Sequence, residues 1–247
     1  MIVRDAGDCW QIVYQTDHAA LSGAFARTWA DRGPRHDALT VAAYRHDDGW
    51  AVWERAPTID GDARPVTFVD VPIPIHVAFY RAMIAAVAND DPYAGLLVSM
   101  HGVGIYKQRF GTDSMLKESH EPPVQAVVEA FVAEQEAGWP ERRAALGASE
   151  DESFADYFRL QMYDRLSLYF CMRDVDAGEA AEITDWRIEP LAPWRVSLDP
   201  FPFAESPARF ELERYVLPKR RWMRGEFRTE LAATEPQRTE LTIEPAK

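Results

Sequence analysis

Apolar residues recur every three or four positions along the first three-quarters of the chain, a spacing that predicts helices. Leu21, Phe25 and Trp29 follow this spacing in a stretch that starts near Asp17, the expected N-cap, and predicts a helix over 18–30. A β-branched and aromatic segment before it, residues 10–15, is typical of a strand. The five further predicted helices cover residues 37–46, 75–87, 93–106, 122–137 and 153–172.

The pattern changes beyond Gly178, where apolar and polar residues alternate with a period of two, as in short antiparallel strands. The sequence therefore predicts a mainly α fold: a helical bundle core over residues 1–177 carrying a β-rich C-terminal extension over 178–247, packed on the core. Residues 54–74 hold four prolines without a helical period and are expected to form a long ordered loop. The alternating segments are WRIEPL, WRVSLDPF, ARFELERYVL and EFRTELA.

Composition narrows the classes of protein. With 47% hydrophobic and 27% charged residues, the chain is expected to fold as a globular protein. Forty acidic residues against 27 basic ones give a net charge of −13, which repels polyanions and disfavours a nucleic-acid partner. No apolar run has the length of a bilayer span, and the opening residues lack an apolar secretory core, so we expect a cytoplasmic protein without a membrane partner. The sequence allows a homo-oligomer.

Histidine and aspartate residues are distributed over successive predicted helices, so that each helix of a bundle would project a side chain inward. Asp164 is preferred to Asp156 and Asp174 on the last of these helices because it shares a face with mostly apolar residues. Imidazole nitrogens and carboxylate oxygens suit divalent manganese, iron, cobalt, nickel or zinc. The candidate ligands are His18, His46, Asp47, His76, His101 and Asp164.

These donors are enough for two divalent ions, Fe, Mn, Ni or Co, if Asp47 bridges them. His18, His46, Asp47 and Asp164 are expected around one ion, and Asp47, His76 and His101 around the second. The structural alternatives are a helix-end histidine, a satisfied core histidine and, for the aspartates, a salt bridge to a neighbouring arginine.

The order His, His-Asp, His, His and Asp resembles the HD-domain (His-Asp) metalloenzyme superfamily in its two-metal form. Over residues 10–175 the chain also resembles a bacterial family known only as a domain of unknown function, through the segments QTDHAALSG, AAYRHDDGW and LLVSMHG. The resemblance implies an HD-like helical fold and the chemistry of phosphohydrolases, cyclic-dinucleotide phosphodiesterases or mixed-valent di-iron oxygenases. Cyclic-dinucleotide cleavage is disfavoured, because no GYP motif follows the dipeptide and Asp48 stands where phosphohydrolases often carry a lysine.

The first functional hypothesis is a metal-dependent hydrolase of a small-molecule phosphoester or phosphoanhydride, in which Asp47 bridges and hydroxide on the metal attacks. Asp48 or Glu54 is the candidate proton relay. An anionic small-molecule substrate would be bound by Lys107, Arg109 or Lys117, with Trp50 and Trp53 lining its pocket.

Two alternatives remain open at the level of the sequence. An HD-type di-iron oxygenase that cleaves a carbon bond would use the same six ligands. A non-catalytic metal-binding, ligand-binding or assembly module would catalyse no reaction, and its β-rich tail would mediate association with other protein chains.

Overall fold

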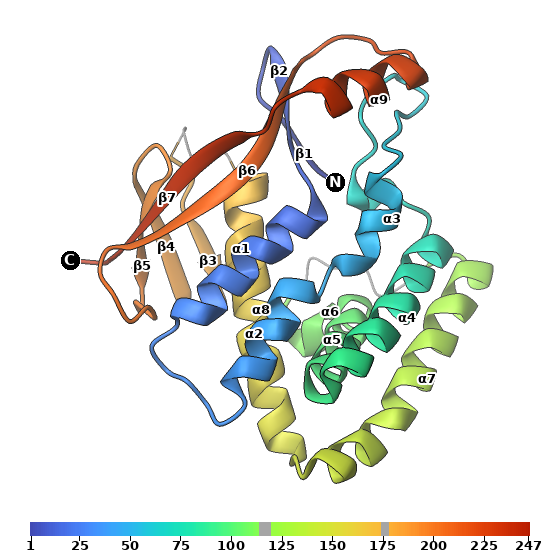
Figure 1. The fold of residues 1–247 in the computed structure, drawn as a ribbon, viewed down its shortest axis with the longest axis vertical. Coiled ribbons are helices and arrows are strands. Elements are labelled where there is room, and N and C mark those ends of the chain that lie inside the picture. The colour runs from blue at the N-terminus through green and yellow to red at the C-terminus, as the bar shows by residue number, and fades with distance from the viewer. Residues whose placement is uncertain (114–119, 174–177) are drawn as a thin grey trace.

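A curled mixed sheet lies across a layer of helices in the computed structural model, which describes residues 1–113, 120–173 and 178–247 (Figure 1). About 54% of the described residues are helical, and the sheet they form is a half-barrel of seven strands. The prediction of a mainly α fold is therefore wrong. It failed because strands from the N-terminus join those from the C-terminal region in one sheet, which makes a full second layer. The division into units at residue 177 stays a prediction.

All six predicted helices are present; most ends are shifted by a few residues, and the helix predicted over 122–137 continues to Leu146. The first begins at Gln15, so Asp17 lies in its first turn and is not its N-cap. The helices are α1 (Gln15–Thr28), α2 (His36–Arg45), α3 (Ala51–Glu54), α4 (Ile73–Asp90), α5 (Pro92–Tyr106), α6 (Gln108–Gly111), α7 (Pro122–Leu146), α8 (Glu150–Met172) and α9 (Arg224–Ala233).

The sheet has the strand order β1-β2-β6-β7-β5-β4-β3, and every neighbouring pair is antiparallel except β5 and β7. The long strand β6 joins its two parts, since Tyr215–Pro218 pair with β2 and Ala208–Arg214 pair with β7. The strands are β1 (Ile2–Asp5), β2 (Cys9–Val13), β3 (Ala181–Ile183), β4 (Trp186–Ala192), β5 (Arg195–Asp199), β6 (Ala208–Pro218) and β7 (Gln237–Pro245).

The segment EFRTELA was predicted as a strand and is part of helix α9. Its two large apolar residues, Phe227 and Leu231, are four positions apart and bury one helical face against Leu217 and Trp222. The spacing of Phe227 and Leu231 fits one face of a helix, and this is a better match than the alternation of apolar and polar residues that suggested a strand.

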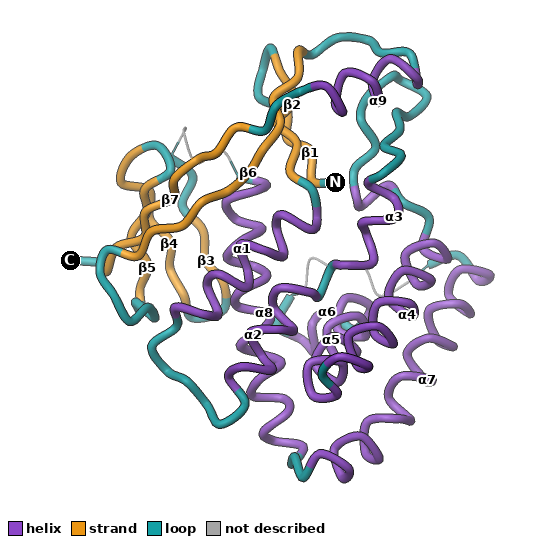
Figure 2. The backbone as a smooth tube through the Cα atoms, viewed as in Figure 1, coloured by secondary structure: helices purple, strands orange, loops and turns teal. Residues whose placement is uncertain are grey.

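Helix α1 lies next to both β6 and α8 (Figure 2), and aromatic side chains connect it to these two elements. The Phe25 ring lies edge-on to Phe210 of β6 at 4.7 Å and is 6.3 Å from Phe170 of α8. One turn later, Trp29 lies 4.8 Å from Tyr163 of α8. Pairs of this kind stabilise a fold beyond the area they bury, so the sheet fixes the position of the helix that carries His18.

Helix α5 runs through the centre of the helical layer and is buried on nearly every side. Its glycines allow close packing: a Cβ added at Gly95 would lie 2.4 Å from the Cβ and 2.5 Å from the Cα of Ala88 on α4. Although α5 is strongly apolar, no described helix is both long and apolar enough to cross a membrane.

We expect Gly95→Ala to lower the free energy of unfolding by about 2 kcal/mol, because the α4 backbone must move to admit the methyl group. Gly138→Ala on α7 is the control: the three atoms nearest to its Cβ would be Arg142 side-chain atoms at 3.4 Å or more. That change should raise stability by about 0.5 kcal/mol through helix propensity. Urea denaturation measures both, and a Gly95→Ala protein as stable as the wild type would contradict the close crossing of α4 and α5.

Candidate metal centre

Five of the six predicted ligands meet in the interior of the helical layer. His18 comes from α1, His46 follows the last residue of α2 and precedes Asp47, His101 lies on α5 and Asp164 on α8. Each of the five is at most 4% exposed. Their ligand atoms form two overlapping groups, His18 with His46 and Asp47, and His46 with His101 and Asp164, whose members all lie within 4.8 Å of one another.

The distances between these atoms suit a single ion. His18 Nε2 lies 3.2 Å from His46 Nε2 and 3.0 Å from Asp164 Oδ1. His46 Nε2 is 3.5 Å from the same Asp164 oxygen, and Asp47 Oδ2 is 3.8 Å from both imidazole nitrogens. Ligand atoms about 2.1 Å from a common ion are separated by roughly 3.0 Å at a right angle and roughly 3.4 Å at a tetrahedral angle. The cluster is close to these values.

Hydrogen bonds to the far side of two rings orient their lone pairs toward this point. His46 Nδ1 lies 2.9 Å from the Ala43 carbonyl oxygen, which only accepts, so the proton is on Nδ1. Ser167 Oγ donates to the Asp164 carbonyl at 2.8 Å and lies 2.7 Å from His18 Nδ1, which then donates to Ser167. In the neutral rings, both Nε2 lone pairs therefore face each other, an arrangement that a cation between them stabilises.

Charges around the rings favour a cation at the same place. Burial disfavours protonation of His46, but the negative charge of Asp47 and the hydrogen bond to Asp164 outweigh it and raise the pKa of His46 to about 9. Burial likewise opposes ionisation of Asp164, yet Arg109 and the two histidines hold its pKa well below the usual range. Burial and the neighbouring His46 lower the pKa of His101. A proton or a metal ion can balance the two carboxylates.

Arg109, predicted to bind a substrate anion, is buried beside the cluster. Its Nη1 lies 2.7 Å from Asp164 Oδ2, in an ion pair without an aligned hydrogen bond. A left-handed turn places it there: Gln108, Arg109 and Phe110 have φ values of 48, 50 and 55°. This conformation costs roughly 1 kcal/mol or more for each non-glycine residue, a strain often found at functional sites.

His76 lies apart from both groups. Its Nδ1 is 2.7 Å from the Tyr106 hydroxyl, and its ring is 4.8 Å from that of Tyr80. Tyr80 donates to Asp47 Oδ1 at 3.2 Å, so the carboxylate oxygen left over for a second ion is already hydrogen-bonded. Burial lowers the pKa of His76 to about 4. The described residues thus bring together the four ligands expected for the first ion, and they do not bring His76 to the second.

The two candidate proton relays have partners elsewhere. Asp48 pairs with Arg45 at 2.7 Å. Glu54 accepts a hydrogen bond from the backbone N–H of Gln15 at 2.6 Å and lies 3.0 Å from the amino group of Met1. Both carboxylates are therefore held by contacts that anchor α3 and the loop before it, and neither belongs to the groups that converge on His46.

Other predicted substrate contacts also lie outside the cluster. Lys107 pairs with Glu136 on α7 at 2.7 Å, near the surface. Trp50 is buried, with its ring 5.1 Å from that of His76, and packs in the core; Trp53 packs against Phe79. Lys117 lies outside the described residues.

Sequence reasoning missed three polar residues that orient the cluster: Tyr80, Gln161 and Ser167. Gln161 Nε2 lies 3.1 Å from His101 Nδ1. Gln161 and Ser167 flank Asp164 at intervals of three residues on α8, so a polar stripe on an otherwise apolar face was the available signal. Nothing in the sequence marked Tyr80 as part of the site, because a buried tyrosine in a helix is usually a core residue.

Comparison with known proteins identifies a family but no activity. Residues 1–219 match a family described as "Protein of unknown function (DUF3891)", and the chain belongs to this family. No curated protein and no solved structure matches the chain. The expected resemblance to a domain of unknown function is thereby confirmed. The buried histidines and aspartates are compatible with the HD superfamily, whose membership stays a prediction.

The competing carboxylate on α8, Asp156, is stabilised by ordinary partners; Asp174 lies outside the described residues. Asp156 Oδ2 accepts a hydrogen bond from the Tyr93 hydroxyl at 2.8 Å, and Oδ1 lies 3.5 Å from Arg159. Burial raises the pKa of Asp156 despite these contacts. Its ionised form therefore costs stability in the fold, and this cost grows as the pH rises from the unfolded pKa through the folded one.

Tyr93→Phe should lower the free energy of unfolding by about 1–2 kcal/mol at pH 7.5, because the ionised Asp156 loses its donor. The loss should shrink at pH 4, where protonation removes the charge that the hydroxyl stabilises. Tyr163→Phe is the matched control, since the buried Tyr163 hydroxyl has no hydrogen-bond partner among the described residues. Denaturation at the two pH values measures both; an equal loss at pH 4 and pH 7.5 would speak against this coupling.

Proposed function

We propose that the chain is a metal-dependent hydrolase of a small-molecule phosphoester, with one divalent ion held by His18, His46, Asp47 and Asp164. The observation that carries the proposal is that the Nε2 atoms of His18 and His46 lie 3.2 Å apart and that each lies 3.0–3.8 Å from a carboxylate oxygen of Asp47 and of Asp164, with the imidazole lone pairs of the neutral rings facing inward. Purely structural histidines would be expected to direct their lone pairs toward donors of the protein.

The donor set favours manganese, iron, cobalt, nickel or zinc, because it combines imidazole nitrogens and carboxylate oxygens without a thiolate. An ion of this kind lowers the pKa of a coordinated water and polarises a phosphoryl oxygen. Ser167 and the Ala43 carbonyl hold the rings of His18 and His46 in the orientation that ligation needs. Loss of a hydrogen-bond partner that orients a metal-binding histidine typically lowers the metal affinity about 10–100-fold.

Charge is the reason to prefer an anionic substrate. With neutral histidines, two carboxylates and the guanidinium of Arg109 leave one unit of negative charge in the cluster. A divalent ion would change this to one unit of positive charge in an environment of low dielectric, where an electrostatic attraction to a phosphoryl group is strong. Arg109 then positions Asp164 through their ion pair.

The separate position of His76 favours hydrolysis with one ion over the di-iron oxygenase. A second ion would need Asp47 Oδ1, which accepts a hydrogen bond from Tyr80, and a ring nitrogen of His76. The Nδ1 atom of His76 instead contacts the Tyr106 hydroxyl. Because Asp48 and Glu54 have other partners, the proposal gives them no part in proton transfer.

Metal content tests the site. Protein purified without a histidine tag and loaded with Mn²⁺ should retain about one equivalent, and His18→Ala and Asp164→Asn should each lower the occupancy at least about tenfold. His120→Ala serves as the control outside the cluster and should bind like the wild type. Inductively coupled plasma mass spectrometry measures the number of metal ions bound per protein molecule. Equal metal content in all four proteins would contradict the site and favour a non-catalytic module.

Turnover tests the reaction. With Mn²⁺ or Co²⁺ bound, the protein should release phosphate from aromatic or aliphatic phosphomonoesters, and Asp47→Asn should lower kcat at least about 100-fold. An Asp48→Asn protein should keep its activity. Oxygen consumption by the iron-loaded protein without phosphate release would overturn the hydrolase in favour of the oxygenase.

A further inference from the structure

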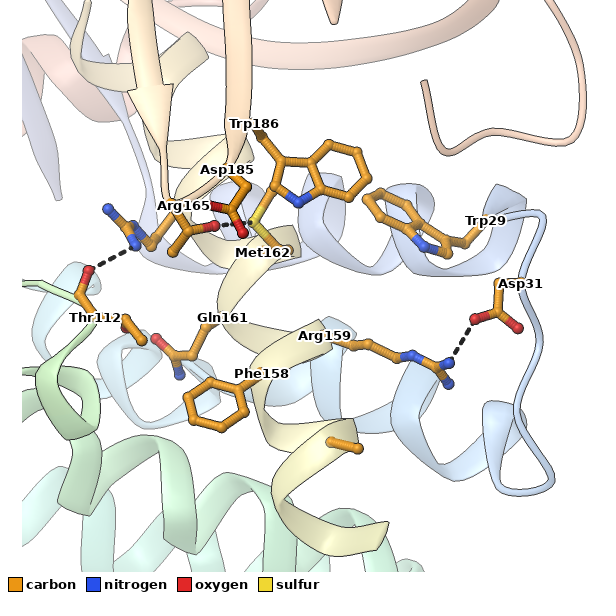
Figure 3. A pocket seen from close by; sticks show the side chains of 12 residues that line it. Trp29, Asp31, Thr112, Phe158, Arg159, Gln161, Met162, Arg165, Asp185 and Trp186 are labelled. Atoms are coloured by element: carbon orange, nitrogen blue, oxygen red, sulfur yellow. Dashed lines mark hydrogen bonds and ion pairs between the residues drawn. The ribbon is translucent and has the colours of Figure 1, made fainter. Parts of the chain in front are cut away.

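A cavity of about 500 Å³ opens between α1, α8 and the turn that connects β3 to β4 (Figure 3). This volume lies in the range of small-molecule sites, and mixed apolar and charged lining is usual there. The residues that matter for recognition are Trp29, Phe158, Gln161, Met162, Arg165 and Trp186.

Aromatic side chains make the apolar wall of the cavity. The rings of Trp29 from α1 and Trp186 from β4 lie 5.4 Å apart at 38°. Phe158 projects from α8 and is 39% exposed, although large apolar residues in this protein are mostly buried. Flat rings on two sides of a small cavity fit a planar aromatic group, which stacks on one ring and meets the edge of another.

Arg165 gives the same cavity an available positive charge. Its Nη1 donates to the carbonyl oxygen of Thr112 at 3.2 Å, and within the described part of the chain it forms no ion pair with a carboxylate. Arg159, also in the wall, differs, because Asp31 lies 2.6 Å from it. A guanidinium with spare N–H groups in a partly apolar cavity binds carboxylate or phosphate oxygens well.

Gln161 connects the cavity to the metal centre. Its side chain lines the cavity, and its Nε2 contacts His101 Nδ1 at 3.1 Å. The Oε1 atom of the same amide is buried and has no hydrogen-bond partner among the described residues. The Gln161 side chain therefore contacts both the aromatic cavity and the cluster, and Arg165 directly follows Asp164 in the chain. An unpaired buried acceptor at this point is the kind of group that a bound ligand satisfies.

We propose that this cavity binds the aromatic part of an aromatic phosphomonoester, with Trp29, Trp186 and Phe158 around the ring and Arg165 on the anionic group. This inference rests on the proposed function and names the substrate class of the same site. It predicts that affinity depends on both the ring and the charge of the ligand.

Calorimetry with three probes separates these contributions: naphthyl phosphate, naphthol and β-glycerophosphate, each with metal-free Asp47→Asn protein so that nothing is hydrolysed. Naphthyl phosphate should bind at least about tenfold more tightly than either of the others. Arg165→Gln should weaken naphthyl phosphate about tenfold and leave naphthol unchanged. Phe158→Ala should weaken both naphthyl compounds about fivefold. Arg187→Gln, which changes an exposed arginine outside this cavity, should affect neither.

Equal binding of the three probes, or binding that neither Arg165→Gln nor Phe158→Ala weakens, would overturn the cavity as the aromatic site. Catalysis is tested separately in the metal-loaded wild type. If naphthyl phosphate binds as predicted and is not hydrolysed, the cavity stands and the hydrolase is wrong. If it is hydrolysed with a KM that both cavity variants leave unchanged, the hydrolase stands and the inference about the cavity is wrong.

Discussion

The structure depends on the burial of two carboxylates and three histidines at the meeting point of its main helices. Removing such groups from water is costly unless each is paired, and here the pairing is nearly complete. Arg109 neutralises part of Asp164, Tyr80 donates to Asp47, and Ser167 and the Ala43 carbonyl bind the outer nitrogens of two rings. In the neutral rings the inner Nε2 lone pairs of His18 and His46 face each other, and these define the proposed ion position.

The rest of the fold holds in place the helices that carry these histidines and aspartates. The sheet holds α1 through Phe25 and Phe210, and close packing at Gly95 brings α5 near α4. The left-handed turn around Arg109 accepts backbone strain in order to place a guanidinium next to Asp164. The strained backbone at Arg109 therefore lowers the stability of the fold locally, at the residue that neutralises part of the negative charge of the cluster. Strain of this kind is often found at functional sites.

Much of the helical layer and the ligand set could be predicted from the sequence, and the reasons for the failures are specific. Helical spacing located α1, α2, α4, α5, α7 and α8 in outline, and the order of histidines and aspartates pointed to six residues, of which five meet in the cluster. The sheet was misjudged because β1 is short and α9 contains alternating residues. His76, which lies apart from the cluster, contacts the Tyr106 hydroxyl, and the turn at Arg109 contains three non-glycine residues with positive φ. Neither feature leaves a local pattern in the chain.

The most direct test of the central claim is a crystal structure of the protein grown with Mn²⁺ and measured at the manganese absorption edge. The account predicts a single anomalous peak about 2.1 Å from His18 Nε2, His46 Nε2, Asp47 Oδ2 and Asp164 Oδ1. A cluster with no anomalous peak, or a peak bound by His76 without His18, would contradict it.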